Sequence, residues 1–388
     1  MYILYGMPGA YYTAKVRSYL VKQGIPFEER VPADPRFASE IMPQIGRWII
    51  PVLQTPDGQV IQDGAVILDH FEALGTQGPP AKPADPLLRV LAHVFELFGG
   101  EGMLRPAMHY RWNFDSVNLK FLHADFIAGL APLSSPEEAE PRFALASSRM
   151  RKATVNFGVN PSTIPHVEAA YLDFLQRFDQ HLAGSPYILG STPTFADYGL
   201  IAPLFPHLAR DPYPSTLMKN FAPRVWRWVE RMNSPNARIG EYLDQAPAWI
   251  DPLVAGSSLH KLLDFIAVDF LPELRAQVAF ANHWLAERPE IAAGSNGLPR
   301  PGDRSIGMAS FTWRGLPAKV IVMPYRLFML QRVKDAAAQL DASQSKDLHA
   351  LLAQCGLTDL LTLRCSRRVE RQGQCEVWGK ASPIGHRS

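Results

Sequence analysis

Cysteine is scarce in this sequence, and the few cysteines are confined to one end of it. Three occur among 388 residues, and Cys355, Cys365 and Cys375 all lie in the last tenth of the chain. Their ten-residue spacing matches no zinc-binding pattern. A chain so poor in cysteine is typical of a reducing compartment.

Long apolar runs and an excess of one charge are also missing. No run reaches the roughly 18 apolar residues of a membrane-spanning helix, and the apolar residues 2–5 are not preceded by the basic region of a secretory signal. Lys and Arg number 39 against 37 Asp and Glu, which gives a formal net charge of +2. A charge this small produces no overall electrostatic attraction for a polyanion. We therefore predict a cytoplasmic protein that binds neither membranes nor nucleic acid.

The composition that remains is that of a folded protein with a sizeable core. Hydrophobic residues make up 47% of the chain and charged residues 20%, which excludes global disorder. At roughly 150 residues per domain, the length allows two or three domains. The 34 prolines are scattered without a period, as expected for many short turns and helix starts.

Residues 1–78 are predicted to form an α/β unit. Residues 13–23 and 65–74 show the helical spacing of apolar side chains, and Gly24 follows the first of them where a glycine commonly ends a helix. Short apolar runs bounded by turn residues predict strands at residues 2–5, 27–31, 49–53 and 60–61. This βαβ-ββα order with a mixed sheet is the thioredoxin-like arrangement.

A segment rich in proline and glycine at residues 78–83 marks a domain boundary, and only helices are indicated directly after it. The clearest helix runs from about His166 to Leu182. Thr194 is followed three residues later by Asp197, a pattern that caps a helix start. Residues 85–248 are therefore predicted to form an all-helical domain.

Residues 251–388 are predicted to form a mostly helical extension packed on the helical domain, with an independent third domain as the alternative. Residues 259–270 carry an apolar helical stripe, residues 306–323 have the pattern of a β-hairpin, and two more helices end near Gly356. From residue 364 to residue 388, six Lys or Arg stand against two Glu. This last stretch is predicted to be a solvated tail.

Four local motifs occur along the first 245 residues. They are LYGMPGAYYTAKVR at residues 4–17, IPVL at 50–53, QDGAVIL at 62–68 and TFAD at 194–197. In this order, on an α/β unit followed by a helical domain, they resemble the glutathione S-transferase superfamily. The resemblance implies that the thioredoxin-like domain binds glutathione and that the helical domain forms the pocket for a second substrate.

The resemblance also implies which residues bind glutathione. The Ile50–Pro51 bond would be cis, which turns the Ile50 backbone toward the ligand. Asp63 would face the amine. Gly64 replaces the family's usual serine and leaves backbone N–H groups at the helix start for the γ-glutamyl carboxylate. The remaining candidates, for the glycine carboxylate and for covering the thiol, are Arg47 and Trp48.

Catalysis in this family requires the thiolate of glutathione, which a hydroxyl donor near the start of the first helix stabilises. Counting along the motif from its two ends points either to Tyr11 or to Ala10, which has no hydroxyl. Tyr12 and Tyr5 are close by and stay open as alternatives. The absence of cysteine from residues 1–354 excludes the mixed-disulfide chemistry of cysteine-type members.

Residues 109–112, with the sequence HYRW, lie where the family's helical domain lines the pocket for the second substrate. A helix end packed on its neighbour is the alternative for this segment. No metal site is expected, because His93 and His109 lack the partners at helical spacing that a metal ion needs.

The function implied is that of a glutathione transferase-like enzyme. Glutathione would be the co-substrate, an electrophilic small molecule the other partner, and a homodimer is compatible with the family. The alternative is a non-enzymatic protein that kept the fold as a binding or scaffold module, which the departures at Ala10 and Gly64 favour. A third hypothesis places the substrate site of an enzyme mainly in residues 251–388.

Overall fold

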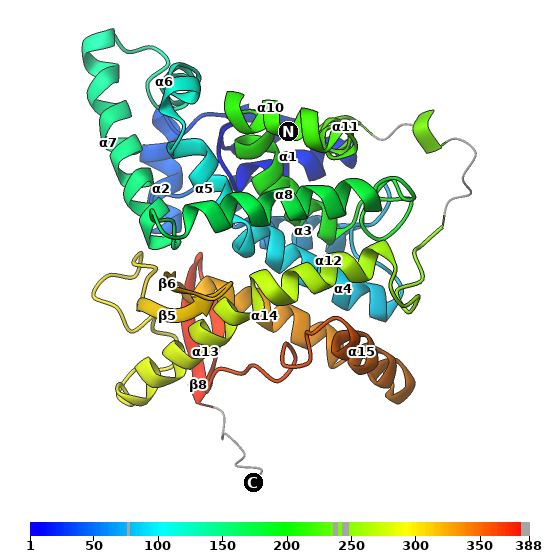
Figure 1. Cartoon of the computed structure of the whole chain (residues 1–388). Helices are drawn as coiled ribbons and strands as arrows, with labels where there is room; N and C mark the ends of the chain where they lie inside the picture. Colours follow the sequence, from blue (N-terminus) through cyan, green and yellow to red (C-terminus); the bar gives the residue numbers. More distant parts are fainter. Residues whose placement is uncertain (76–77, 236–239, 243–247, 382–388) are drawn as a thin grey trace.

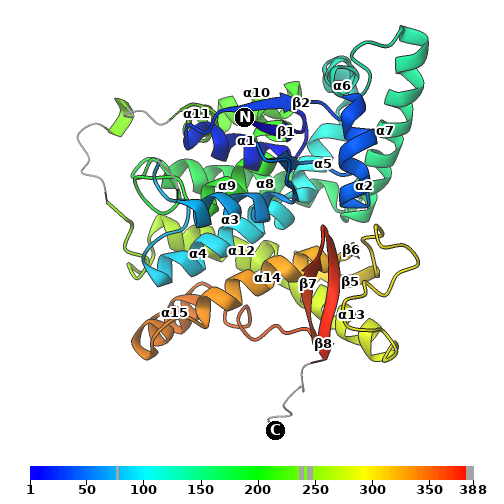
Figure 2. The same ribbon diagram turned by 180° about the vertical axis from the view of Figure 1, so that it is seen from behind.

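The structure is a computed structural model that describes residues 1–75, 78–235, 240–242 and 248–381. Figures 1 and 2 show the N-terminal unit among a large set of helices, with further helices and the hairpins β5–β6 and β7–β8 at the opposite side of the molecule. None of the helices in these ranges is long and apolar enough to cross a lipid bilayer.

The N-terminal unit has the thioredoxin-like fold expected from its sequence. Its strands lie in the order β2-β1-β3-β4, with β1 parallel to β2 and antiparallel to β3. Neighbouring residues of β1 point to opposite faces: Leu4 joins the main core, whereas Tyr5 joins a smaller one. The elements are β1 (Tyr2–Tyr5), α1 (Thr13–Lys22), β2 (Phe27–Arg30), η1 (Phe37–Ile41), α2 (Met42–Ile45), β3 (Val52–Gln54), β4 (Val60–Gln62) and α3 (Gly64–Leu74).

One strand of this unit begins later than predicted. The apolar pattern placed the third strand at residues 49–53, but β3 begins only at Val52. Ile49 and Ile50 instead pack against the smaller core, which η1 and α2 cover. Periodicity does not separate such a packed loop from a strand, and Pro51 has no N–H with which to continue the ladder.

The next part of the described chain is all helical. Thr194 caps α9, since its hydroxyl accepts a hydrogen bond from the Ala196 backbone, while Asp197 accepts one from the Thr194 backbone at 2.9 Å. The predicted capping box is confirmed. The elements are α4 (Pro86–Leu97), η2 (Phe98–Gly102), α5 (Leu104–Trp112), α6 (Asp115–Leu130), α7 (Pro136–Asn156), α8 (Ile164–His181), α9 (Phe195–Pro203), η3 (Leu204–Ala209), α10 (Pro212–Phe221), α11 (Pro223–Met232) and η4 (Gly240–Tyr242).

Proline explains several of these helix starts. Pro86, Pro136, Pro212 and Pro223 each occupy the first turn of a helix, where the missing N–H would have no partner within the helix. The high proline content is therefore consistent with many helices rather than with disorder.

The extension packs against the helical part and shares its core. Phe265 and Phe270 each lie with their rings 6.0 Å from Phe98, and buried residues from β1 to Trp378 belong to one apolar cluster. Figures 1 and 2 show α13, α14 and α15 on the side of the molecule opposite α10 and α11. The elements are α12 (Ser258–Asp269), α13 (Leu271–Ala286), β5 (Gly307–Trp313), β6 (Leu316–Val322), α14 (Pro324–Ala337), α15 (Ala342–Gln354), β7 (Arg367–Gln372) and β8 (Cys375–Ala381).

The prediction of a solvated tail from residue 364 is wrong as far as residue 381. This stretch forms the β7–β8 hairpin, in which Val369 and Trp378 are buried. Its charges are matched by ion pairs, such as Arg368 with Asp335 and Arg371 with Glu376. A local excess of basic residues does not by itself indicate a solvated segment, because acidic residues from elsewhere in the chain can pair with them.

Candidate functional site

Asp63 lies at the junction of β4 and α3. Its backbone φ of 97° is one that residues other than glycine rarely adopt. The carboxylate accepts hydrogen bonds from the backbone nitrogens of Ala65 at 2.9 Å and Val66 at 3.2 Å, and so caps α3. A negatively charged side chain is therefore held in place beside the positive end of a helix dipole.

Gly64, the next residue, lies close to α1. A Cβ atom there would be only 3.3 Å from Cδ of Lys15, which is tighter than an ordinary contact. A serine there would therefore require the Lys15 side chain to shift by a few tenths of an ångström.

The loop before β3 holds the other residues expected to bind glutathione. The Ile50–Pro51 bond is cis. Arg47 is buried and paired with Glu376 of the extension. Trp48 is 53% exposed, and its ring contacts Phe37 edge-on at 6.1 Å.

The three candidate tyrosines have different surroundings. Tyr5 is fully buried and packs on Phe37 in the smaller core, on the other face of the sheet from Leu4. Tyr11 donates its hydroxyl hydrogen bond to the Gly99 carbonyl at 2.7 Å. Tyr12 donates to Oε1 of Glu101 at 3.1 Å. Burial first and the charge of Glu101 second raise the pKa of Tyr12 well above its ordinary value, so this hydroxyl keeps its proton.

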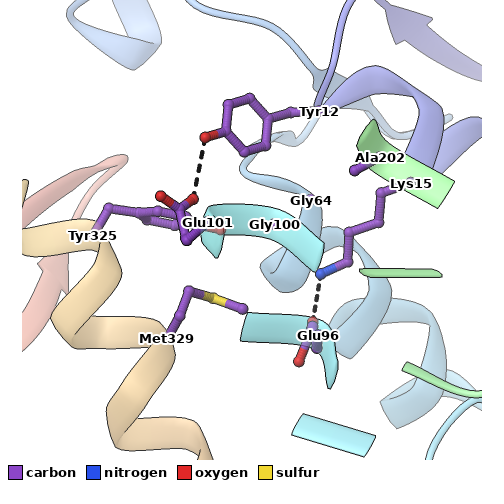
Figure 3. Close-up of a pocket in the computed structure, with 9 residues that line it drawn as sticks. All are labelled: Tyr12, Lys15, Gly64, Glu96, Gly100, Glu101, Ala202, Tyr325 and Met329. Carbon is purple, nitrogen blue, oxygen red and sulfur yellow. Dashed lines mark hydrogen bonds and ion pairs between the residues drawn. The ribbon is translucent and has the colours of Figure 1, made fainter. Parts of the chain in front are cut away.

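A small cavity lies between the N-terminal unit, the helical part and the extension (Figure 3). Of the candidate residues, Tyr12 and Gly64 line it. The others do not, namely Tyr5, Tyr11, Arg47, Trp48, Ile50, Pro51 and Asp63. Its volume of about 20 Å³ is room for about one or two water molecules. The residues that line it are Tyr12, Lys15, Gly64, Glu96, Gly100, Glu101, Ala202, Tyr325 and Met329.

One wall of this cavity carries the buried carboxylate of Glu96. Lys15 forms an ion pair with it, His93 Nδ1 lies 2.8 Å from Oε2, and Arg332 Nε lies 3.5 Å from the same oxygen. Burial alone would raise the pKa of Glu96, but the charges of Lys15 and Arg332 lower it well below its usual value. Glu96 is therefore ionised and held by three side chains.

Glu101 also lines the cavity. Besides the Tyr12 hydroxyl, it accepts a hydrogen bond from Nε of Arg326 at 2.8 Å. The other side of Arg326 contacts Glu273 at 2.5 Å, and Arg105 also pairs with Glu273. Burial raises the pKa of Glu101 although Arg326 acts against that shift. This chain of buried charges joins the helical part to the extension.

Residues 109–112 do not line the cavity. All four are buried in the helical part, and Arg111 binds Asp211 and the Gly9 carbonyl, the latter at 2.8 Å. Of the two alternatives for this segment, the structure therefore shows packing. Within the described ranges, no group of three or more His, Cys, Asp or Glu side chains is arranged to hold a metal ion.

The sequence reasoning missed Glu96, Glu101, Tyr325 and Glu376. Glu96 and Glu101 carried a usable signal, because each is a lone acid within an otherwise apolar stretch, and such an acid is buried only with a partner. Tyr325 and Glu376 carried none, since nothing in their local sequence connects them to the N-terminal unit.

Comparison with known proteins identifies two segments of the chain. Residues 4–79 match the N-terminal domain of glutathione S-transferases, and residues 161–231 match the C-terminal domain of the same family. No curated protein matches this chain.

Several solved structures are similar to part of the chain. A glutathione S-transferase from Methylobacterium radiotolerans in complex with glutathione sulfonate is 20% identical, with 64% of this chain and 96% of that one covered and a TM-score of 0.36. The β-etherase LigF from Sphingobium sp. strain SYK-6 is 20% identical, with coverage of 63% and 99% and a TM-score of 0.42. A glutathione S-transferase from Methylobacillus flagellatus with glutathione bound is 19% identical, with coverage of 64% and 100% and a TM-score of 0.35. Residues 4–79 and 161–231 are therefore an N-terminal and a C-terminal domain of the glutathione S-transferase superfamily.

Proposed function

We propose that this protein is a glutathione transferase-like enzyme that activates the thiol of glutathione for attack on an electrophilic small molecule. The observation that carries the proposal is Asp63, a carboxylate held in an unusual backbone conformation at the start of α3, whose neighbour Gly64 lines a cavity together with Tyr12. Non-glycine residues keep such a conformation only where their surroundings enforce it, and functional sites are common among these places.

In this proposal the three parts of the chain have separate roles. Residues 1–78 bind glutathione, with Asp63 facing its amine and the backbone at Gly64 facing a carboxylate. Residues 85–248 supply the pocket for the electrophile. Residues 251–388 form a third unit that closes the site from the other side. A cytoplasmic location and a homodimer are part of the same proposal.

Tyr12 is the tyrosine that we propose as the donor to the thiol. Tyr12 lines the cavity, its hydroxyl donates to Glu101, which lines the same cavity, and its raised pKa keeps the proton on that hydroxyl. A neutral donor aimed at sulfur favours the thiolate over the thiol. Tyr11 is second, because it does not line the cavity and its hydroxyl donates to the Gly99 carbonyl.

Replacing Asp63 by asparagine is expected to weaken glutathione binding about ten- to a hundredfold. The substitution keeps the shape of the side chain but removes the charge that would face the amine, and a charge-assisted hydrogen bond contributes roughly 1.5–3 kcal/mol. Titration calorimetry measures the change. Asp85→Asn is the matched control, because Asp85 caps α4 in the same way, through the Leu88 backbone at 2.8 Å. Equal affinities of the two variants would contradict the role of Asp63.

Replacing Tyr12 by phenylalanine is expected to leave glutathione bound and to raise the pKa of its thiol toward the ordinary value of about 8.5. The ultraviolet absorbance of the thiolate, followed during a pH titration of the complex, gives this pKa. Tyr11→Phe removes a neighbouring hydroxyl that points to a backbone carbonyl, and its thiol should titrate as in the parent. If only the Tyr11 variant shifts, the assignment of Tyr12 fails.

A second candidate function is a binding or scaffold protein without catalysis. The observation that favours it is the size of the cavity, about 20 Å³, which admits no tripeptide in the conformation described here. Retention on immobilised glutathione with elution by free glutathione supports the enzyme. Absence of both binding and turnover with a reactive aryl halide supports the scaffold.

A further inference from the structure

The turn of the β7–β8 hairpin lies against the free edge of the N-terminal sheet. β4 is the last strand of that sheet. The side-chain amide of Gln374 accepts a hydrogen bond from the Gln62 backbone nitrogen at 2.9 Å and donates one to the Val60 carbonyl at 3.1 Å. One side chain therefore bonds to the strand edge as a further strand would. In Figure 2 the turn of the hairpin points toward α2.

The same turn binds Arg47, the arginine that was expected to bind a carboxylate of glutathione. Nη1 and Nη2 of Arg47 contact the two carboxylate oxygens of Glu376 at 2.8 Å and 3.1 Å, the paired geometry that arginine forms with any carboxylate. Nη2 also donates to the Gln374 carbonyl at 3.0 Å. Both partners of the ion pair are buried. Burial alone would raise the pKa of Glu376, but Arg47 lowers it to about 2, so the pair is charged at neutral pH.

A second residue of the extension faces Asp63. Tyr325, at the start of α14, is buried and lines the cavity together with Tyr12. Burial first, and then the negative charge of Asp63, raise the pKa of the Tyr325 hydroxyl. Figure 3 shows Tyr325 beside Glu101, below Tyr12. Both polar side chains expected to bind glutathione, Arg47 and Asp63, thus face groups of the extension.

We infer that the turn of the β7–β8 hairpin, residues 372–376, is a cap over the proposed glutathione site, and that Glu376 holds the position on Arg47 that a ligand carboxylate takes when the cap lifts. This inference rests on the proposed function and adds the regulation of its site. A free carboxylate of the ligand and that of Glu376 compete for one guanidinium, so the closed and the bound states exclude each other.

The hairpin, rather than α14, is the part that moves. α14 is fixed to the helical part and to α13 by its residue Arg326, which is 1% exposed and pairs with the buried Glu101 and Glu273. The hairpin is anchored at its far end, where the buried Trp378 stacks against Trp284. Its turn contacts the sheet through polar groups, and Gln372 and Gly373 are exposed. When the turn lifts, a carboxylate of the ligand replaces Glu376 on Arg47, and Glu376 keeps Arg371, whereas no ligand group would replace Arg326 between its two glutamates if α14 moved.

Cys375 provides a reporter within the turn. Its sulfur lies 3.9 Å from the Ile45 carbonyl and is half-buried in the closed state. Burial raises the pKa of Cys355 and of Cys365 to about 12, so these two thiols react slowly with an alkylating reagent. The rate at which iodoacetamide modifies Cys375, located by mass spectrometry, therefore measures how often the turn is open.

The test uses the full chain and the variant Glu376→Gln, which keeps the shape of the side chain and removes its charge. Glu370→Gln is the matched control, an exposed glutamate on the other strand of the same hairpin. In the Glu376 variant we expect Cys375 to be alkylated several-fold faster. We also expect glutathione to bind about tenfold tighter, because a larger fraction of the protein is already open and able to bind. Gln374→Ala, which loses both bonds to β4, should change both quantities in the same direction.

The outcomes separate this inference from the proposed function. If glutathione binds the parent and both turn variants with equal affinity, the cap is overturned and the proposed function stands. If the variants open, as shown by faster alkylation, and still bind no glutathione, both are overturned. Alkylation rates that stay at the level of the Glu370→Gln control would also overturn the cap.

Discussion

Replacing Arg326 by methionine is expected to lower the free energy of unfolding by about 3–5 kcal/mol. Arg326 is 1% exposed and is the shared partner of Glu101 and Glu273. Without it, one carboxylate keeps only a tyrosine hydroxyl and the other keeps Arg105. Burial already raises the pKa of Glu101 in the parent, so the loss of the arginine leaves a charge that the interior does not tolerate. Urea unfolding followed by circular dichroism measures the difference.

The pH dependence of this deficit identifies its cause. A carboxyl group whose pKa is higher in the folded state than in the unfolded state binds a proton more tightly when folded, so its penalty disappears as the pH falls. The deficit of the Arg326 variant should therefore be smaller near pH 5 than near pH 8. Arg368→Met is the control, because its pair with Asp335 is about half exposed and should contribute less than about 1 kcal/mol. A deficit that is the same at both pH values would point to lost packing instead.

Ending the chain after residue 250 is expected to give a protein that aggregates. The shortened chain lacks Phe265 and Phe270, which contact Phe98. It also lacks α14, which packs on α4 and carries Arg326, the ion-pair partner of Glu101. At roughly 25 cal/mol per Å² of apolar area, even a few hundred Å² of newly exposed surface costs several kcal/mol, which is comparable with the whole stability of a domain. Solubility and size-exclusion profiles of the shortened chain give the result.

A cut made after folding is the matched control. Residues 253–256 are exposed between the helical part and α12, so a protease site placed there is accessible in the intact fold. After cleavage, the two pieces should elute together and separate only in denaturant. A soluble 1–250 piece that leaves the column alone, with normal glutathione affinity, would show that residues 251–388 are an independent domain.

Part of the candidate site could be predicted because its residues are close in sequence. Asp63 and Gly64 belong to a turn between a strand and a helix, and such turns follow from local spacing. The choice between Tyr11 and Tyr12 could not be made in this way. It depends on what each hydroxyl meets 88 and 89 residues further on, the Gly99 carbonyl in one case and the Glu101 carboxylate in the other.

Much of the order of strands and helices, but not the β7–β8 hairpin, was determined by the sequence alone, because the periodicity of apolar residues and the turn and cap residues act over a few positions. The thioredoxin-like unit, the capped helix after Thr194 and the hairpin at residues 307–322 were all predictable on that basis. Which partners the side chains of the candidate site bind was decided only by the tertiary structure. Arg47 meets Glu376 across 329 residues, and a charge in a basic, polar stretch does not reveal whether water or a buried partner satisfies it. For that reason the same hairpin that looked like a solvated tail in sequence lies over the candidate glutathione site in space.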